Sequence, residues 1–291
     1  MTTGYFDRVW RARGARGLKN AFTALLRGDR GAILAAIADG ENSFPVMYLL
    51  APEIENAGLD GDLAEHVKHA MRLTAIKAGD SVRRGRYDRL LSPYGGVVEP
   101  TYDAVKWMID TGADWDGPSS GRDSFDAAID LAAAYLASRF PDGDALAKIA
   151  ELIFRRNRRG LYIHDLVWGF FQTADERALS VIADYIKSEN TADHRLACRL
   201  LGLDDVPRTR AERVAAHDEF VKWLTENRPY IYLTGEYFNL ATSPHTISRD
   251  DEAKHLHREI DPETRAPLTP LTEQEEAELR VFRAQNGAEA V

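Results

Sequence analysis

Cysteine is nearly absent from this chain, which has a single one, Cys198, among 291 residues. One cysteine cannot form an intramolecular disulfide, and its place in the helical run Arg195–Leu201 favours a buried, inert thiol over a reactive one. Long apolar runs are missing too, since no segment approaches the roughly 18 consecutive apolar residues that a membrane-spanning helix needs. The first residues also lack the charged and then apolar pattern of a signal peptide. Together these absences predict a cytoplasmic protein.

Catalytic motifs are lacking as well. The sequence contains no Gly-x-x-x-x-Gly-Lys-Ser/Thr loop for phosphates, no Gly-x-Gly-x-x-Gly for dinucleotides, no Gly-x-Ser-x-Gly and no His-Glu-x-x-His. A single cysteine excludes the cysteine-rich zinc modules. The sequence therefore predicts no catalytic residue, no metal ligand and no cofactor. An enzyme whose active site is assembled from scattered residues stays an alternative.

Histidines supply the one concrete version of that alternative. His66 and His69 are three residues apart on one helix face, and Asp62 lies one turn earlier, so the three could bind the metal of a hydrolase. A solvated helix face with ordinary histidines explains the pattern more simply. His164 and Asp165 open another helix, where the carboxylate is more simply a charge that complements the helix dipole than a catalytic group.

Positive charge is in the minority and unevenly distributed. The net charge is −9 and the pI about 5.4, which disfavours a phosphate backbone as the main partner. Residues 1–30 nevertheless carry seven basic and two acidic side chains, whereas residues 250–291 carry five basic and eleven acidic ones. This asymmetry predicts that the acidic end packs on the basic end, within one chain or between neighbours, or that the basic clusters bind nucleic acid or an acidic protein. The clusters are Arg8, Arg11, Arg13, Arg16 and Lys19; Arg83, Arg84, Arg86 and Arg89; and Arg155, Arg156, Arg158 and Arg159. The third is more simply structural, because cations there complement the C-terminus of a helix.

Helical periodicity is what the chain has in abundance. Its 44% hydrophobic and 29% charged residues are ordinary values for a globular protein. Apolar side chains recur at helical spacing in the first third of the chain, although Gly14 and Gly17 weaken the first segment. The helices predicted there span residues 5–27, 31–38, 45–50, 62–78 with Asp62 as N-cap, and 81–91.

From residue 100 onward the chain repeats itself. Residues 145–153 and 178–186 are identical at five of nine positions, and the shared residues fall on one helix face. Val-Lys-Trp also occurs twice, at 105–107 and at 221–223. Repetition at 33 to 45 residues is typical of stacked helical hairpins, although two amphipathic helices can also converge by chance. The sequence thus predicts an all-α, solenoid-like fold.

One part of this region resembles an ankyrin repeat. Residues 104–114 are similar to the second helix of such a repeat running into its Gly-Ala-Asp turn, and residues 124–133 to the first helix of the next repeat. The Thr-Pro-Leu-His motif is absent and the spacing drifts, so a degenerate form over residues 100–226 is the extent of the resemblance. HEAT-like helix pairs would produce similar spacing. The resemblance implies a protein that binds other proteins.

The end of the chain differs in character. Residues 230–238 are aromatic and predict a strand or an extended segment, and residues 241–270 hold four prolines and predict an extended arm. Thr272 and Glu275 form a capping-box pattern that predicts a short final helix over 273–285, which has too few apolar residues to stand alone. The predicted organisation is an N-terminal helical cap over 1–99, a repeat region over 100–229 and a C-terminal arm over 230–291.

The leading functional hypothesis is a non-enzymatic scaffold or assembly protein, with the helical stack as a binding surface and the arm as a docking element. The alternatives are the metal-dependent hydrolase and a nucleic-acid-associated factor that uses the basic clusters. Trp115 lies in a polar loop, where packing against a neighbouring helix competes with a role in binding. The predicted partner-binding residues are Trp115, Arg83, Arg84, Arg86, Tyr237, Phe238, Leu279 and Phe282.

Overall fold

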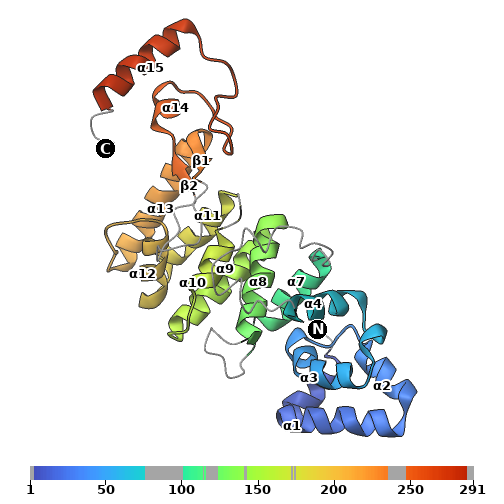
Figure 1. The fold of residues 1–291 in the computed structure, drawn as a ribbon. Helices are drawn as coiled ribbons and strands as arrows, with labels where there is room; N and C mark the ends of the chain where they lie inside the picture. Colours follow the sequence, from blue (N-terminus) through green and yellow to red (C-terminus); the bar gives the residue numbers. More distant parts are fainter. Residues whose placement is uncertain are drawn as a thin grey trace. The chain divides into compact units, whose positions relative to one another are not determined.

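The computed structural model describes residues 3–75, 101–113, 115, 124–140, 143–171, 173, 175–234 and 247–286. These residues are mostly helical, with one two-stranded sheet (Figure 1), so the predicted all-α class is confirmed. The chain divides into two compact units, unit 1 (Met1–Asp175) and unit 2 (Glu176–Val291). This division lies within the predicted repeat region rather than at residue 99 or 229. Among the described residues, no helix is both long and apolar enough to cross a membrane.

Unit 1 begins with three helices around an apolar core. These are α1 (Tyr5–Gly28), α2 (Arg30–Ile37) and α3 (Phe44–Asn56), and their core includes Phe6, Phe22 and Met47. At Gly14, α1 is kinked with a φ of 64°, in the left-handed region that glycine tolerates best, so the predicted weakness of the segment is confirmed there. The third helix extends beyond the predicted 45–50 to Asn56, with Pro52 inside it. Pro45 lies in its first turn, where no intrahelical N–H donor is needed.

The next helix shows that the predicted N-cap is wrong. A 3-10 turn, η1 (Asp60–Asp62), precedes α4 (Glu65–Ala75), and Leu63 between them is extended with a ψ of 154°. The extended residue separates Asp62 from the first helical turn, so Asp62 does not cap the helix. Residues 76–78 of the predicted helix and the whole predicted helix 81–91 lie outside the described residues.

The rest of unit 1 packs around an alanine-rich helix. Four helices form this part: α7 (Tyr102–Gly112), α8 (Ser124–Arg139), α9 (Gly143–Arg158) and α10 (His164–Phe170). Almost all of α8 from Ala127 to Ala137 is buried, because both α7 and α10 pack against it. Small side chains allow this close approach: a Cβ added to Gly169 of α10 would lie 3.0 Å from the Cβ of Ala134.

Unit 2 begins with a shorter set of helices. They are α11 (Arg177–Ala183) with the 3-10 turn η2 (Asp184–Lys187), α12 (Thr191–Leu200) and α13 (Arg210–Asn227). Cys198 of α12 is buried, and burial raises the pKa of its thiol, as expected for an inert cysteine. The two similar segments of the sequence lie on α9 and on α11 with η2, and thus in different units.

The C-terminal arm has more structure than the sequence predicts. After the 3-10 turn η3 (Arg228–Tyr230), strand β1 (Ile231–Leu233) pairs antiparallel with β2 (Ile247–Arg249), Ile231 opposite Arg249. The prediction of an extended segment over 241–270 is wrong at α14 (Asp251–His255). Asp250 explains that helix: its side chain accepts the N–H of Ala253 at 2.9 Å, and its own N–H donates to Tyr230 at 2.7 Å.

The final helix, α15 (Glu273–Asn286), docks within its own unit. The predicted capping box forms, with Thr272 donating its N–H to Glu275 at 2.8 Å and its Oγ1 accepting the N–H of Glu275 at 3.3 Å. Arg283 donates two hydrogen bonds of 2.7 Å to Glu252 of α14. The final helix, which has too few apolar residues to stand alone, therefore packs against its own chain through α14.

Candidate functional site

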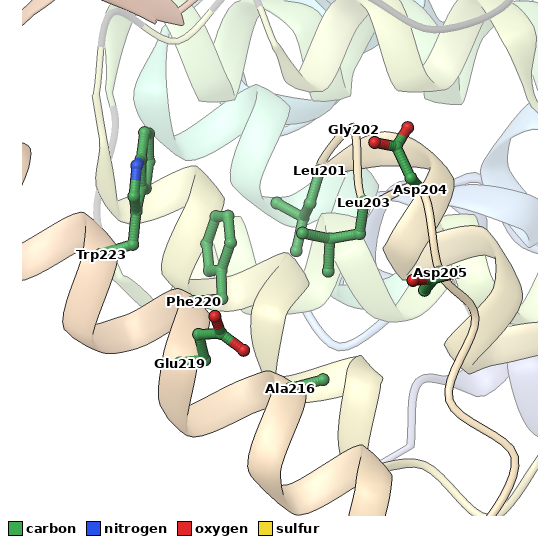
Figure 2. Close-up of a pocket in the computed structure, with 9 residues that line it drawn as sticks. All are labelled: Leu201, Gly202, Leu203, Asp204, Asp205, Ala216, Glu219, Phe220 and Trp223. Carbon is green, nitrogen blue, oxygen red and sulfur yellow. The ribbon is translucent and has the colours of Figure 1, made fainter.

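The candidate site is a pocket in unit 2 at the turn between α12 and α13 (Figure 2). It encloses about 490 Å³. Leucines come from the turn and two aromatic rings from α13, and Figure 2 shows the rings of Phe220 and Trp223 standing side by side on that helix. The nine lining residues are Leu201, Gly202, Leu203, Asp204, Asp205, Ala216, Glu219, Phe220 and Trp223.

A helix-ending motif builds the first wall of this pocket. Gly202 follows α12 with a φ of 67°, its N–H donates to the carbonyl of Arg199 at 3.3 Å, and the N–H of Leu203 donates to that of Cys198 at 2.9 Å. This pair of bonds is the Schellman motif, in which a left-handed residue turns the chain back over the end of a helix. The motif thereby holds Leu203 at the pocket.

Replacing Gly202 with alanine is expected to destabilise this end of α12 by about 1 kcal/mol, since a side chain is strained in the left-handed region. An added Cβ would have open space around it, so the strained backbone conformation is the only source of the expected loss of stability. Hydrogen exchange of the α12 and α13 amides measures the loss. Asparagine, which tolerates this conformation, should cost less; an equal or larger loss for Gly202→Asn would contradict the explanation.

The first turn of α13 sets the opposite wall. Thr209 accepts the N–H of Glu212 at 3.2 Å, and Glu212 accepts the N–H groups of Thr209 at 3.0 Å and Arg208 at 2.7 Å. This capping box fixes where the helix begins and thus which side chains share a face. Positions 216, 219, 220 and 223 follow the helical spacing and all line the pocket. The rings of Phe220 and Trp223 stack with centroids 5.7 Å apart.

The pocket combines an apolar interior with an acidic rim. Phe220 is 7% exposed, whereas Leu201, Leu203 and Trp223 are half-buried. The carboxylates of Asp204, Asp205 and Glu219 belong to exposed residues and have no hydrogen bond or ion pair with any described part of the chain. Such a site fits an apolar group that carries or neighbours a positive charge.

None of the residues that line this pocket is among the predicted site residues. The apolar face that carries Trp223 favours a core position, whereas the structure leaves this ring half-buried at the pocket. Two local signals mark the site in the sequence: Gly202 directly after an apolar helix, and the Thr209-x-x-Glu212 pattern before the next one. They predict where both helices end and begin, but not that a cavity lies between them.

Three of the predicted partner-binding residues, Trp115, Leu279 and Phe282, lie in the described part of the chain. Trp115 is half-buried and stacks on Trp10 with centroids 4.5 Å apart, so it packs against α1. Leu279 is 9% exposed, and the ring of Phe282 stacks on His255 at 4.3 Å, so both side chains pack within unit 2. The other predicted residues lie outside the described residues: Arg83, Arg84, Arg86, Tyr237 and Phe238.

His66 and His69 form no metal site with other described residues. His66 lies edge-on to Trp107 with ring centroids 5.0 Å apart, and burial lowers the pKa of its imidazole. The Nδ1 atom of His69 is 3.3 Å from the Oγ1 atom of Thr101. Within the described ranges, no group of three or more His, Cys, Asp or Glu side chains could hold a metal ion.

The third basic cluster contains an unexpected buried ion pair. Arg156 is 5% exposed and donates to Asp130 at 2.7 Å and to Asp126 at 3.2 Å, both on α8. The structural role predicted for this cluster from its position at the end of α9 takes another form at Arg156, whose side chain reaches from α9 into the core to bind α8. We call Asp126, Asp130, Arg156 and Asp165 the ion cluster.

The ion cluster holds more carboxylates than arginines. Burial raises the pKa of Asp130 to about 7 against the opposing effect of Arg156, and Asp165 and Asp126 raise it further. The hydroxyl of Tyr162 donates to Asp165 at 2.7 Å. All four cluster residues are less than a tenth exposed, so the cluster contributes to the packing of α8, α9 and α10 and not to an open site.

Comparisons of the chain with protein-family models, with curated proteins and with solved structures found no match.

Proposed function

We propose that this protein is a non-enzymatic interaction protein whose pocket between α12 and α13 binds a segment of a partner protein. The segment presents an apolar side chain flanked by lysine or arginine. The observation that carries the proposal is the combination of an apolar interior of about 490 Å³ with three carboxylates that have no partner in the described chain.

The size and chemistry of the pocket support a side chain as the ligand. The volume is near the lower end of the range for small-molecule sites, which run from about 300 to 1,000 Å³. Stacked Phe220 and Trp223 offer a face to an aliphatic group or to a guanidinium. The carboxylates of Asp204, Asp205 and Glu219 attract and orient a basic neighbour, and aromatic anchors of this kind dominate interface energies.

The helical architecture is consistent with a binding role. We further propose that the helices form stacked hairpins of ankyrin-like or HEAT-like type. In such a stack, turns such as Leu201–Asp205 are exposed at the edge. The packing of α8 against α7 and α10 supports hairpin packing within unit 1. A cytoplasmic location stays a prediction from the sequence.

A selection from a library of random short peptides, displayed on phage and captured by the full-length chain, tests the proposed function. We expect the selected peptides to share an aliphatic or aromatic residue next to lysine or arginine. The combined variant Asp204→Asn, Asp205→Asn and Glu219→Gln should weaken their binding by about tenfold or more, because it removes three rim charges. Fluorescence anisotropy with labelled peptides measures the change.

Two further variants make the result specific to the pocket. Ala216→Arg fills the pocket from α13 and should abolish binding, because Ala216 lines it and is only half-buried. Glu226→Gln is the matched control, since it removes an exposed carboxylate from the same helix outside the pocket. Selected peptides that bind all variants equally, or no selection of a basic and apolar pattern, would contradict the proposed function.

A further inference from the structure

The corner between α1 and α2 presents the features that the pocket is proposed to bind. Leu26 is 39% exposed. Few large apolar side chains among the described residues are as exposed as this one. Arg27 follows it directly and Arg30 begins the next helix; both are exposed, and neither has an ion pair or hydrogen bond with described residues. The corner is thus an apolar side chain flanked by two available cations.

Asp29 makes this corner rigid. Its N–H donates to the carbonyl of Leu25 at 2.9 Å and so ends α1, while its side chain accepts the N–H of Ala32 at 3.1 Å and caps α2. One residue therefore fixes the end of one helix and the start of the next. A binding element that is already ordered loses little conformational entropy when it binds.

Other arginines on the surface of α1 add positive charge that complements the acidic rim of the pocket. Arg11, Arg13 and Arg16 are exposed, and none has a hydrogen bond or ion pair with the described residues. The first 30 residues carry an excess of five positive charges, in a chain whose net charge is −9. A basic end and acidic surfaces elsewhere on one chain attract neighbouring copies head to tail.

We propose that the occupant of the pocket is a second copy of this chain, bound through the corner of Leu26, Arg27 and Arg30. This inference rests on the proposed function and names its partner. Leu26 enters between Leu203 and Phe220, and the two arginines face the rim carboxylates. Because the corner and the pocket are different surfaces, the contact is heterologous and generates a ring or an open chain of copies.

Sedimentation velocity of the full-length chain over a range of concentrations tests the inference. We expect the mean mass to rise with protein concentration and to fall with added salt, because screening weakens the contact between arginines and carboxylates. A corner variant, Leu26→Gln with Arg27→Glu, and a pocket variant, Asp204→Arg with Asp205→Arg, should each be monomeric. All four positions are surface positions, and circular dichroism checks that both variants keep their helical content.

A mixture of the two variants gives the decisive result. The corner variant keeps an intact pocket and the pocket variant keeps an intact corner, so equal amounts should form pairs and nothing larger. Arg159→Glu and Glu226→Lys are the matched controls, because they reverse exposed charges outside the corner, the α1 surface and the pocket. Both controls should assemble like the wild type.

Other outcomes overturn the inference and separate it from the proposed function. A chain that stays monomeric at every concentration in low salt, or assembly that persists in both variants, excludes the second copy as the occupant. Pocket-dependent binding of selected peptides would then leave the proposed function standing with a foreign partner. Binding of a DNA or RNA duplex by a monomeric wild type, lost in the corner variant, would instead assign the arginines to nucleic acid.

Discussion

Replacing Arg156 with methionine is expected to lower the free energy of unfolding of unit 1 by about 3–5 kcal/mol, the usual cost of removing one member of a buried ion pair. The arginine is 5% exposed and donates to Asp130 at 2.7 Å and to Asp126 at 3.2 Å. Without it, the carboxyl groups of Asp126 and Asp130, each of a residue only 2% exposed, would lose the arginine that binds them in the core. Ionised carboxylates in such a place are far less stable than in water.

Hydrogen exchange of the full-length chain is the suitable measurement, because the two compact units need not unfold together. Peptides from α8 and α9 report the free energy of opening of unit 1, and peptides from α12 and α13 serve as an internal reference in unit 2. We expect the loss of protection in unit 1 and unchanged protection in unit 2.

A surface arginine of the same helix end provides the control. Arg159 is exposed directly after α9, so Arg159→Met should change the opening free energy by no more than about 0.5 kcal/mol. Adding Asp126→Asn and Asp130→Asn to Arg156→Met should recover part of the loss, since the two carboxyl groups that lost the arginine are then replaced by neutral amides. A loss below 1 kcal/mol for Arg156→Met, or no recovery with the added amides, would contradict a stabilising role for the ion cluster.

The local features of the fold could be predicted from the sequence because their causes are local. Apolar periodicity located α1, and the Thr272-x-x-Glu275 pattern located the start of α15. Each depends on contacts between residues a few positions apart, or on a burial pattern that repeats every turn. The same reasoning misplaced the start of α4, since nothing near Asp62 reveals that Leu63 is extended.

The features that depend on contacts between distant residues could not be predicted. Arg156 lies 26 and 30 positions from its two aspartates, and its own surroundings in sequence are those of an exposed basic cluster. The pocket likewise requires the turn after α12 to lie against one face of α13. Gly202 and the Thr209-x-x-Glu212 pattern mark both ends of that turn in the sequence, but they do not reveal the space between the helices. Function was the least predictable part, because no catalytic or binding motif in the sequence marks the residues that line the pocket.

The stability of unit 1 is expected to fall as the pH rises from 5 to 7, by an amount that depends on Asp130. The pKa of its carboxyl is raised from 3.8 to about 7 in the folded chain, chiefly by burial. In this pH range the folded state therefore holds a proton that the unfolded state has released. A proton bound only by the folded state makes stability decrease with pH, here by about 1 kcal/mol per unit, with a limit of 1.4.

Asp130→Asn should remove this dependence, because an amide does not titrate, and the difference between variant and wild type isolates the contribution of Asp130. That difference is needed because His66, whose pKa burial lowers, makes the stability of the same unit rise with pH up to about 6.5. Asp144→Asn, at an exposed position in the first turn of α9, is the matched control and should leave the pH profile unchanged. The opening free energies of α8 and α9, measured by hydrogen exchange at several pH values, provide the test. Parallel profiles for wild type and Asp130→Asn from pH 5 to 8 would mean that Asp130 stays ionised, and that Arg156 outweighs the effect of burial.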